Sequence, residues 1–463
     1  MSSKPLLLPL FSASVNTDRS WERLDGVADV FDCPHSTPQL VDDVTAPYVV
    51  RSQDVRSGTF QFQNAAHVSF ETYKERIKRV EPQYGDLLYS REGTYFGIAA
   101  EVPKGMQVCL GQRMVLIRPD ASRIDHLYLK YWLNSPQVFG HIHGFRDGTV
   151  AERLNLPVIR GLAIAFPSLA AQRATATILS ALDDRITLLR ETNATLEAIA
   201  RALYKSWFVD FDPVHAKREG RIPAGMDEAT LALFPDGFEE SEFGPVPKGW
   251  QLAPFGRLLS HTIGGDWGSE EPNEKDDTRV AIIRGTDIPD LQSGANNRVP
   301  IRYTSGKKLA SRKLQRGDLI LEVSGGSKDQ PTGRSLYMSE GLLQHFDCPV
   351  EPASFCRLLR PHSEHIGVLL GQHLSYIYAQ GKTWEYQNQS TGIANFQTAH
   401  FLEAELVAVP SDEVLSAFAG IVCPMIDRSH LTQMHRLAEV RDTLLPRLIA
   451  GQLRLPEAEA LVA

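Results

Sequence analysis

Two long stretches of the chain carry apolar residues at helical spacing. In both, apolar side chains recur every three or four positions, or every seventh where a polar residue intervenes. The two series are Ile178, Leu182, Ile186, Leu189, Leu196, Ile199, Leu203 and Trp207, and then Leu431, Met434, Leu437, Val440, Leu444 and Leu448. Such seams predict amphipathic helices, and at 1.5 Å per residue a helix over 172–208 would be about 55 Å long. Length and duplication favour two helices that pack on each other over two ordinary core-facing helices.

The limits of these helices can also be predicted. Each follows a Pro-Ser pair, and the side chains of Ser168 and Ser411 are suited to accept hydrogen bonds from first-turn backbone N–H groups. The second stretch contains Pro424 and Pro446. Each proline removes a backbone donor and crowds the preceding turn, so we expect a kink or an interruption there.

The segments before each helix show short apolar runs separated by Gly, Pro and Asp, which predicts a strand-rich mixture. This pattern occurs twice in the same order. The matched segments are 46–55 and 279–288, 70–90 and 304–322, 110–120 and 353–362, and 148–168 and 391–411. The first match aligns Arg51 with Arg284, and the second aligns two Gly-Asp strands, YGDLLYS and RGDLILE. We interpret the chain as one unit duplicated.

The predicted fold class is α+β, with two pseudo-symmetric α/β domains separated by two long helices. The linker is rich in Pro, Gly and acidic residues, and we expect one short helix in it, at 227–234. The predicted limits are 1–167 for the first domain, 168–209 for the first helix, 210–249 for the linker, 250–410 for the second domain and 411–463 for the second helix.

Composition restricts the class of protein. The apolar fraction of 43% and charged fraction of 22% are typical of a soluble globular protein, and no window is long and apolar enough to span a membrane. The five cysteines form no CxxC pair, so we expect a reducing cytoplasm and no metal site or disulfide framework. The net charge of −8 lowers the expectation of nucleic-acid binding without excluding it, because a local basic patch decides binding.

No strong catalytic motif is present. The sequence has no GxxxxGK[ST] phosphate loop, no GxGxxG dinucleotide turn and no HExxH zinc motif. Asp290, Asp318 and Glu322 could form the carboxylate cluster of a metal-dependent nuclease, but Ser324 stands where such a site needs a lysine. A nuclease therefore stays an alternative interpretation.

The residues present are better suited to binding DNA. Seven cations occur between residues 298 and 316, with no acidic residue between Asp290 and Asp318. These can neutralise phosphates without reading sequence. The loops after the two Gly-Asp pairs, and the loops at 141–149 and 382–389, carry side chains that can hydrogen-bond base edges. Candidate DNA-binding residues are Arg51, Arg56, Lys74, Arg76, Lys78, Arg79, Ser90, Arg91, Thr94, Tyr95 and Arg146 in the first repeat, and Arg284, Arg302, Lys307, Lys308, Arg312, Lys313, Ser324, Lys328, Gln330, Arg334, Lys382, Trp384 and Gln387 in the second.

Several motifs together resemble one family. They are the repeated Gly-Asp strand with its variable loop, the turns GTVAERLNLP and TGIANFQTAH, the helix start FPSLAAQ, and the segment ALYKSWFVDFDPV. Over nearly the whole chain these resemble the specificity subunit of type I restriction–modification systems. The second helix start, PSDEVLSAF, lacks the usual glutamine.

The resemblance implies two target-recognition domains, each reading one half of a bipartite asymmetric site in double-stranded DNA, and two helices that form an antiparallel coiled coil. It implies that this chain has no catalytic activity and binds no cofactor. S-adenosylmethionine would belong to partner modification (methyltransferase) subunits, and ATP and Mg²⁺ to partner restriction subunits, in a complex for phage defence. The other alternative interpretation is a coiled-coil scaffold without direct DNA contact.

Overall fold

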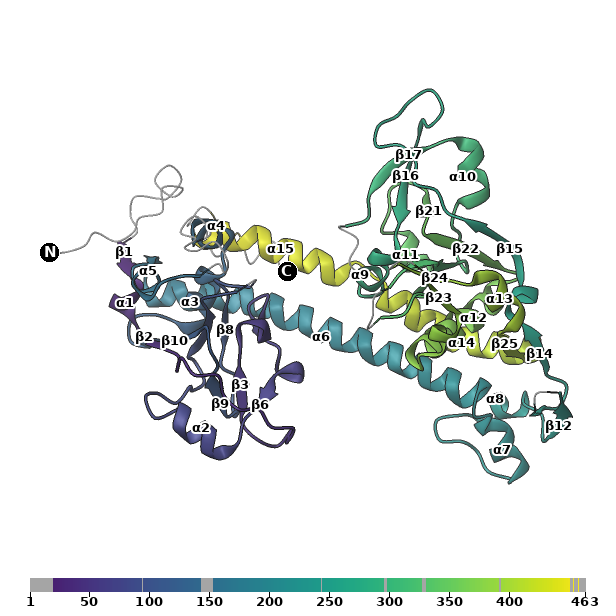
Figure 1. The fold of residues 1–463 in the computed structure, drawn as a ribbon, viewed down its shortest axis with the longest axis horizontal. Helices are drawn as coiled ribbons and strands as arrows, with labels where there is room; N and C mark the ends of the chain where they lie inside the picture. The colour runs from purple at the N-terminus through teal and green to yellow at the C-terminus, as the bar shows by residue number, and fades with distance from the viewer. Residues whose placement is uncertain are drawn as a thin grey trace. The chain divides into compact units, whose positions relative to one another are not determined.

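The computed structural model describes residues 20–93, 95–142, 153–242, 244–294, 298–326, 330–390 and 393–449, together with Leu453 and Glu457. The chain divides into two compact units (Figure 1). Unit 1 comprises residues 1–186 and 437–463, and unit 2 comprises residues 187–436. Both contain helices and strands, which confirms the α+β fold class. The domain limits stay a prediction.

Unit 1 contains a four-stranded sheet, a three-stranded sheet and two small strand pairs. The four-stranded sheet has the order β2-β10-β7-β8, and the three-stranded sheet has the order β6-β3-β9, with β3 and β9 parallel. The strands are β1 (Ser20–Arg23), β2 (Ala28–Asp32), β3 (Tyr48–Val50), β4 (Val55–Arg56), β5 (Thr59–Phe60), β6 (Ala66–His67), β7 (Leu87–Ser90), β8 (Ala99–Glu101), β9 (Val108–Leu110), β10 (Met114–Pro119) and β11 (Ala163–Phe166). The helices before the long one are α1 (Leu24–Val27), α2 (Phe70–Arg76), α3 (His126–Leu133), α4 (Pro136–Ile142) and α5 (Leu156–Arg160), with 3₁₀ turns η2 (Ser52–Asp54) and η3 (Phe62–Asn64).

Unit 2 repeats this topology. Its sheets have the orders β15-β22-β18-β20 and β17-β16-β21, with β16 and β21 parallel, and β14 pairs with β25 as β1 pairs with β11. These strands are β14 (Gln251–Pro254), β15 (Leu259–Gly264), β16 (Thr278–Ile283), β17 (Ile301–Thr304), β18 (Leu319–Glu322), β20 (Ser335–Tyr337), β21 (Val350–Pro352), β22 (Cys356–Pro361) and β25 (Leu406–Val409). The internal repeat predicted from the sequence is therefore confirmed in these two sheets and in the β1–β11 and β14–β25 pairs, while the β4–β5 pair has no counterpart among the described strands of unit 2.

Unit 2 also has a small sheet of its own and a matching set of helices. The small sheet has the order β19-β24-β23, from β19 (Ser324–Gly325), β23 (Gln387–Ser390) and β24 (Ile393–Phe396). The helices are α9 (Ile288–Gln292), α10 (Gly306–Arg312), α11 (Glu340–Leu343), α12 (Glu364–Ala379) and α13 (Thr398–Ala404), with 3₁₀ turns η5 (Phe255–Leu258), η6 (Gly285–Asp287) and η7 (Lys382–Tyr386).

The central strands are buried on both faces, and their alternation places side chains in two different cores. In β10, Val115 and Ile117 pack in one apolar cluster, while Met114 and Leu116 pack in another. This is the period of two that a strand imposes on its side chains. Because both faces are covered, the sequence of such a strand reads as a continuous apolar run.

The first long helix, α6 (Leu169–Phe208), begins where the sequence predicts. The Ser168 hydroxyl accepts a hydrogen bond from the backbone N–H of Ala171 at 3.4 Å, which confirms the predicted cap. Ser411 precedes α14 (Asp412–Ser429), but its side chain makes no capping hydrogen bond to that helix's backbone.

A kink or an interruption of the second helical stretch was predicted at the prolines, and an interruption there was wrong. Pro424 lies inside α14 and Pro446 lies inside α15 (Gln433–Ile449), while the break falls at residues 430–432. At the break, side chains donate hydrogen bonds to two backbone carbonyls. Asn193 Nδ2 donates to the Ser429 carbonyl at 2.9 Å, and His345 Nε2 donates to the His430 carbonyl. Tertiary hydrogen bonds thus satisfy carbonyls that helix ends leave without intrahelical partners.

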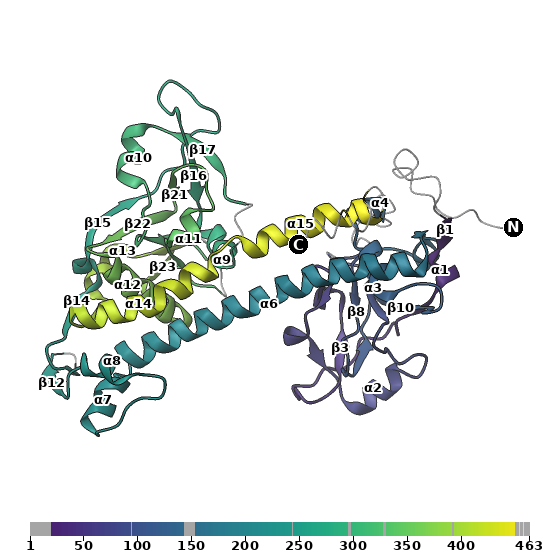
Figure 2. The same cartoon turned by 180° about the vertical axis from the view of Figure 1, so that it is seen from behind.

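The long helices pack antiparallel, which confirms the predicted coiled coil. In unit 2, Asn193 contacts Ser429, whereas Trp207 packs on Phe418 with ring centroids 5.7 Å apart. Figure 2 shows α14 alongside the second part of α6. The predicted seam is wrong at Ile199, which is 41% exposed. The buried residues there are Ala200, Tyr204 and Phe208, together with Trp207 of the predicted seam.

The segment after α6 is more ordered than the predicted linker. The expected short helix is present as α8 (Glu228–Ala232), but α7 (Asp212–Arg218) and the hairpin of β12 (Phe238–Ser241) and β13 (Gly244–Pro247) were not predicted. Phe234 and Trp250 from this region pack on Trp207 and Phe208 at the end of α6. Over the described part of the chain, none of the helices has the length and apolarity needed to cross a membrane.

Candidate nucleic-acid interface

The Gly-Asp pairs that begin β7 and β18 are part of the framework. Asp86 accepts hydrogen bonds from Arg118 Nη2 at 2.7 Å and Nε at 2.8 Å. Asp318 accepts the same two bonds, at the same distances, from Arg360. Gly85 and its counterpart in unit 2 have φ of +92° and +87°, a conformation that favours glycine. The repeated Gly-Asp therefore sets the start of each strand, with both aspartates buried against an arginine.

A second repeated pair lies at the 3₁₀ turns η2 and η6. Arg51 donates to Asp54, and Arg284 donates to Asp287, in each case from Nε and Nη2 of the arginine. The Asp side chains also accept the backbone N–H of the arginines. Both arginines thus hold a turn, and their predicted contact with DNA stays a prediction.

Two of the predicted polar loops of unit 2 meet in the small sheet β19-β24-β23. Ser324 on β19 donates to Asn395 Oδ1 on β24 at 2.9 Å. The backbone N–H of Thr332 donates to Gln387 Oε1 on β23 at 3.0 Å. Next to this sheet Trp384, on η7, is 41% exposed. Segments that are far apart in the sequence therefore form one polar surface, with Gln330, Asn388 and Asn395 exposed on it.

The equivalent loop of unit 1 is shorter. Ser90, at the end of β7, is fully buried, and its hydroxyl donates to the Tyr95 carbonyl at 2.6 Å. Arg91 pairs with Asp32 at 3.2 Å. Tyr95 is 45% exposed and stacks on the Arg56 guanidinium, 3.2 Å from the ring centroid. Tyr95 thus gives this loop an exposed aromatic face, which can stack on a nucleic-acid base. The candidates Thr94, Arg146 and Lys328 lie outside the described residues.

Arg334, a candidate for DNA contact, forms a buried ion pair, and its contact with DNA stays a prediction. Its Nε donates to Glu322 Oε2 at 2.9 Å, and its Nη2 donates to Oε1 of the same carboxylate. The side chains are 14% and 2% exposed. Arg334 therefore has its main partner inside the protein.

Lys382, another candidate, also has an internal partner. Its Nζ lies 2.8 Å from Oε2 of Glu405, a residue that is 1% exposed. Glu405 also accepts hydrogen bonds from His373 Nε2 at 2.8 Å and from the Tyr386 hydroxyl at 2.5 Å. Burial by itself would raise the pKa of Glu405, but these hydrogen bonds outweigh it and lower the pKa to about 2. The carboxylate is thus ionised and anchors both ends of η7.

The basic cluster at residues 298–316 was expected to be unopposed, and this was wrong. Acidic residues from elsewhere in unit 2 pair with most of it. The pairs are Arg298 with Asp290 (3.3 Å), Arg302 with Glu270 (3.1 Å), Lys308 with Asp266 (2.9 Å), and Arg316 with Glu364 (2.6 Å). Lys307 and Lys313 are exposed, and no ion pair is described for either.

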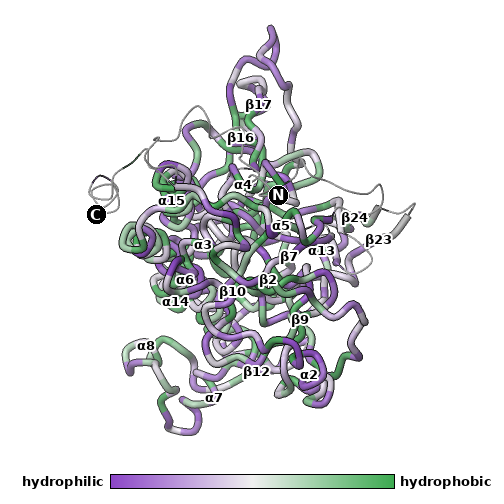
Figure 3. Tube along the Cα trace, turned by 90° about the vertical axis from the view of Figure 1, so that its left-hand side faces the viewer, coloured by the Kyte–Doolittle hydropathy of each residue, from purple (hydrophilic) through white to green (hydrophobic). Residues whose placement is uncertain are grey.

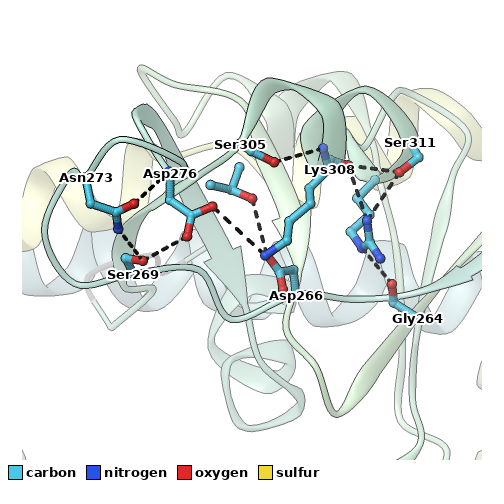
Figure 4. Close-up of polar contacts among 10 residues, drawn as sticks. Gly264, Asp266, Ser269, Asn273, Asp276, Ser305, Lys308 and Ser311 are labelled. Carbon is cyan, nitrogen blue, oxygen red and sulfur yellow. Dashed lines mark hydrogen bonds and ion pairs between the residues drawn. The ribbon is translucent and has the colours of Figure 1, made fainter.

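The loop at 265–277 supplies two of these acids (Figure 4). Lys308 lies between Asp266 and Asp276, and Ser269 donates to Asp276 at 2.9 Å. Asn273 donates to Ser269 at 2.9 Å, which links the loop to itself. Figure 3 shows a hydrophilic segment beyond β16 and β17, where this loop lies. The loop therefore neutralises part of the basic face of α10.

On the equivalent helices α2 and α10, the final arginines are held by backbone carbonyls. Arg76 Nε donates to the Leu110 carbonyl at 2.8 Å, and Arg312 Nε donates to the Gly264 carbonyl at 3.0 Å. Lys78 pairs with Glu75. Lys74 and Arg79 are exposed, and no ion pair is described for either.

Trp267 and Glu351 were missed in the sequence. Trp267 is 38% exposed and stacks on Arg302, whose guanidinium carbon is 4.1 Å from the ring centroid. Glu351 is fully buried on β21, and neither of its oxygens has a hydrogen-bond partner among the described residues. Burial, followed by the charge of Asp266, raises the pKa of Glu351 to about 7. Neither residue stands in a repeated motif, so no local signal marks them.

The carboxylates of the nuclease alternative are not gathered in one site. Asp290 pairs with Arg298, Asp318 with Arg360, and Glu322 with Arg334. Within the described ranges, no group of three or more His, Cys, Asp or Glu residues is placed to hold a metal ion. A metal-dependent nuclease is therefore not favoured.

Comparison with known proteins agrees with this geometry. Residues 20–198 match the family described as "Type I restriction modification DNA specificity domain". The chain resembles type I restriction–modification specificity subunits. The HindI specificity subunit of Haemophilus influenzae is 26% identical over 432 residues, covering 82% of this chain and 88% of the relative. The MjaIX specificity subunit of Methanocaldococcus jannaschii is 23% identical over 406 residues, covering 84% of this chain and 82% of the relative.

A solved structure shows the same fold. The crystal structure of the type I restriction–modification S subunit from M. genitalium aligns with a TM-score of 0.54 and 17% identity. The alignment covers 96% of this chain and 99% of that chain. The predicted resemblance to specificity subunits is thus confirmed, with the duplicated framework and long helices described above.

Proposed function

We propose that the chain is the DNA sequence-specificity subunit of a type I restriction–modification complex. Each unit reads one half of a bipartite, asymmetric site in double-stranded DNA, and the long helices dock modification and restriction subunits. The chain itself is not catalytic and binds no cofactor. S-adenosylmethionine belongs to the modification subunits, and ATP and Mg²⁺ belong to the restriction subunits.

One observation carries this proposal. The two units share sheets, turns and the Asp–Arg pairs of the Gly-Asp strands, but the loops that follow those strands differ in length and side chains. A duplicated active site would repeat its polar side chains. A shared framework with divergent polar loops instead suits two readers of different base sequences, because base edges are distinguished by hydrogen-bonding side chains.

The structure narrows the set of residues that we propose to contact DNA. Candidates engaged inside the protein are assigned to the framework, and exposed candidates are assigned to the interface. The exposed members are Lys74, Arg79 and Tyr95 in unit 1, and Lys307, Lys313, Gln330 and Trp384 in unit 2. The half-buried Ser324 and Gln387 are added because they lie in the small polar sheet β19-β24-β23.

An exchange of recognition segments tests the proposal. The chain, purified with its modification subunit, is expected to direct methylation to one bipartite sequence. Replacing residues 250–410 with those of another specificity subunit should change one half-site and leave the other unchanged. A complex without sequence preference would contradict the proposal and favour a scaffold without DNA contact, and a change in both halves would contradict the assignment of one half-site to each unit.

A further inference from the structure

A buried ion pair closes the base of the polar loop in unit 2. Glu322 is the last residue of β18, and Arg334 immediately precedes the neighbouring strand β20. The backbone N–H of Glu322 donates to the Arg334 carbonyl at 2.8 Å, and the two side chains add a bidentate pair. Backbone and side chains therefore join the same two residues, which fixes where the loop leaves and re-enters the sheet.

The carboxylate of Glu322 is confined on two sides by glycines. A Cβ at Gly285 would lie 2.4 Å from Glu322 Oε1, and a Cβ at Gly325 would lie 2.5 Å from it. Any larger residue would displace the carboxylate. Because bidentate Arg–carboxylate pairs also impose a geometry, Glu322 is held in one orientation.

Beyond this pair, the chain enters the small polar sheet directly. The backbone N–H of Val323 donates to the Phe355 carbonyl, and Val323 in turn accepts from the N–H of Phe396, both at 2.9 Å. Ser324 then pairs with Asn395 across β19 and β24. On the returning side, Thr332 contacts Gln387. The ion pair therefore lies where the chain enters and leaves the segment whose side chains we propose to read bases.

The equivalent position in unit 1 also closes a loop, with different chemistry. Ser90 occupies the place of Glu322, four residues after the shared Gly-Asp aspartate. Its hydroxyl bonds the Tyr95 carbonyl and accepts from the backbone N–H of Ile98 at 3.2 Å. The backbone pairing at the base of the two loops is alike, because Ser90 N–H donates to the Ile98 carbonyl at 3.0 Å as Glu322 N–H donates to the Arg334 carbonyl at 2.8 Å. The side-chain chemistry alone differs, with one hydroxyl in unit 1 and a bidentate ion pair in unit 2.

We propose that Glu322 and Arg334 are positioning residues for DNA reading by unit 2. They contact no base, and they set the orientation of β19 and of residues 330–333 against β23 and β24. The proposal rests on the proposed function. It predicts that the pair affects discrimination at one half-site rather than general affinity for DNA.

The test compares this ion pair with the one at the other end of the same strand. Glu322→Gln and Arg334→Met break the Glu322–Arg334 ion pair, and we call these the clamp variants. Asp318→Asn breaks the framework pair with Arg360. Each variant is purified in complex with the modification subunit. Binding is measured for the cognate duplex and for duplexes altered in one half-site, and the half-site of unit 2 is assigned by the exchange of residues 250–410. Unfolding temperature and salt dependence are recorded for every variant.

The clamp variants should lose discrimination at the half-site of unit 2 by about tenfold or more, the scale of one base-reading contact. Discrimination at the other half-site and the salt slope should not change. Asp318→Asn should lower the unfolding temperature comparably and keep discrimination at both half-sites. The double variant Glu322→Gln with Arg334→Gln should recover part of the discrimination, since two amides can hydrogen-bond each other.

Two results would overturn the inference. One is full discrimination by a folded Glu322→Gln complex, and the other is an equal decrease of discrimination in Asp318→Asn. Failure of the proposed function would look different, because the unaltered complex would then show no sequence preference at either half-site.

Discussion

Unit 1 has Leu162 at the position before β11, and unit 2 has Glu405 at the equivalent position before β25. The equivalence is set by the backbone, because the Leu162 carbonyl accepts from Leu24 N–H at 2.9 Å and the Glu405 carbonyl accepts from Phe255 N–H at 2.8 Å. Leu162 is 2% exposed in an apolar cluster, while Glu405 is 1% exposed and holds three polar partners. Equivalent backbone positions thus hold an apolar side chain in unit 1 and a charged one in unit 2, and the neighbouring side chains match each of them.

The positions of Glu322 and Glu351 show the same contrast. Their counterparts in unit 1 are Ser90 and Cys109, both fully buried. Strand pairing and main-chain hydrogen bonds have been kept between the units, whereas the buried polar groups near the loops have diverged. We infer that the framework is constrained by folding and that the groups under the loops have adapted to different loops.

The largest effects on stability are expected when each of residues 162 and 405 is replaced by the residue found at the equivalent position of the other unit. Leu162→Glu buries a carboxylate among apolar side chains without matching donors, and should destabilise unit 1 by about 4 kcal/mol. Glu405→Leu should cost about 2 kcal/mol, because the buried His373 and Tyr386 lose an acceptor while the half-exposed Lys382 can be rehydrated. Hydrogen exchange, which reports local stability, can measure each unit separately. A negligible cost for either substitution would show that its neighbours are not specialised for the residue now present.

The pH dependence of stability should distinguish Glu351 from Cys109. The pKa of Glu351 rises from 4.5 to about 7 in the folded chain, so the folded state binds a proton that the unfolded state releases. Stability should therefore fall as pH rises from about 4.5 to about 7, by about 3 kcal/mol at most, and then level off. Glu351→Gln should remove this decline in unfolding measurements at several pH values. Burial raises the pKa of the Cys109 thiol to about 11, so Cys109→Ser should not alter the profile over this range.

The two Gly-Asp pairs should behave alike, in contrast to the diverged positions. Asp86→Asn and Asp318→Asn each weaken a nearly buried carboxylate's bidentate pair with a partly exposed arginine. Each should cost about 2 kcal/mol, less than a fully buried pair. Urea unfolding followed by hydrogen exchange would measure both. A difference of more than about 1 kcal/mol between the two costs would argue against an equivalent framework role. Substitutions at independent sites usually agree with additivity more closely than this.

The smallest effects are expected at exposed cations. Lys307→Ala with Lys313→Ala in unit 2, and Lys74→Ala with Arg79→Ala in unit 1, should weaken DNA binding equally for all sequences. For every phosphate that is no longer neutralised, the salt slope should fall by about 0.9. Lys308→Ala serves as a matched control, because Lys308 already pairs with Asp266 and should change the slope less. Binding titrations at several salt concentrations measure these slopes, and a larger change for Lys308 would contradict the assignment.

Local patterns in the sequence were enough to predict the duplication, the fold class and the first long helix. Helical spacing, the Ser168 cap and the aligned Arg51 and Arg284 depend on residues that are near in sequence or repeated in order. The same holds for the Gly-Asp pairs, because a glycine with positive φ followed by a bonded aspartate is a local requirement of the strand start. These features can therefore be predicted from the sequence without knowledge of contacts between distant residues.

What a charged side chain does was decided only by the tertiary structure. The cations at 298–316 have no acidic neighbour in sequence, yet Asp266, Glu270 and Glu364 reach them in space. Arg334 and Lys382 similarly look like surface residues until Glu322 and Glu405 are placed beside them. The break at 430–432 was hidden for the same reason, since its hydrogen bonds come from Asn193 and His345. The free energy of a charge or a buried carbonyl depends on its neighbours in space, and residues distant in sequence supply them.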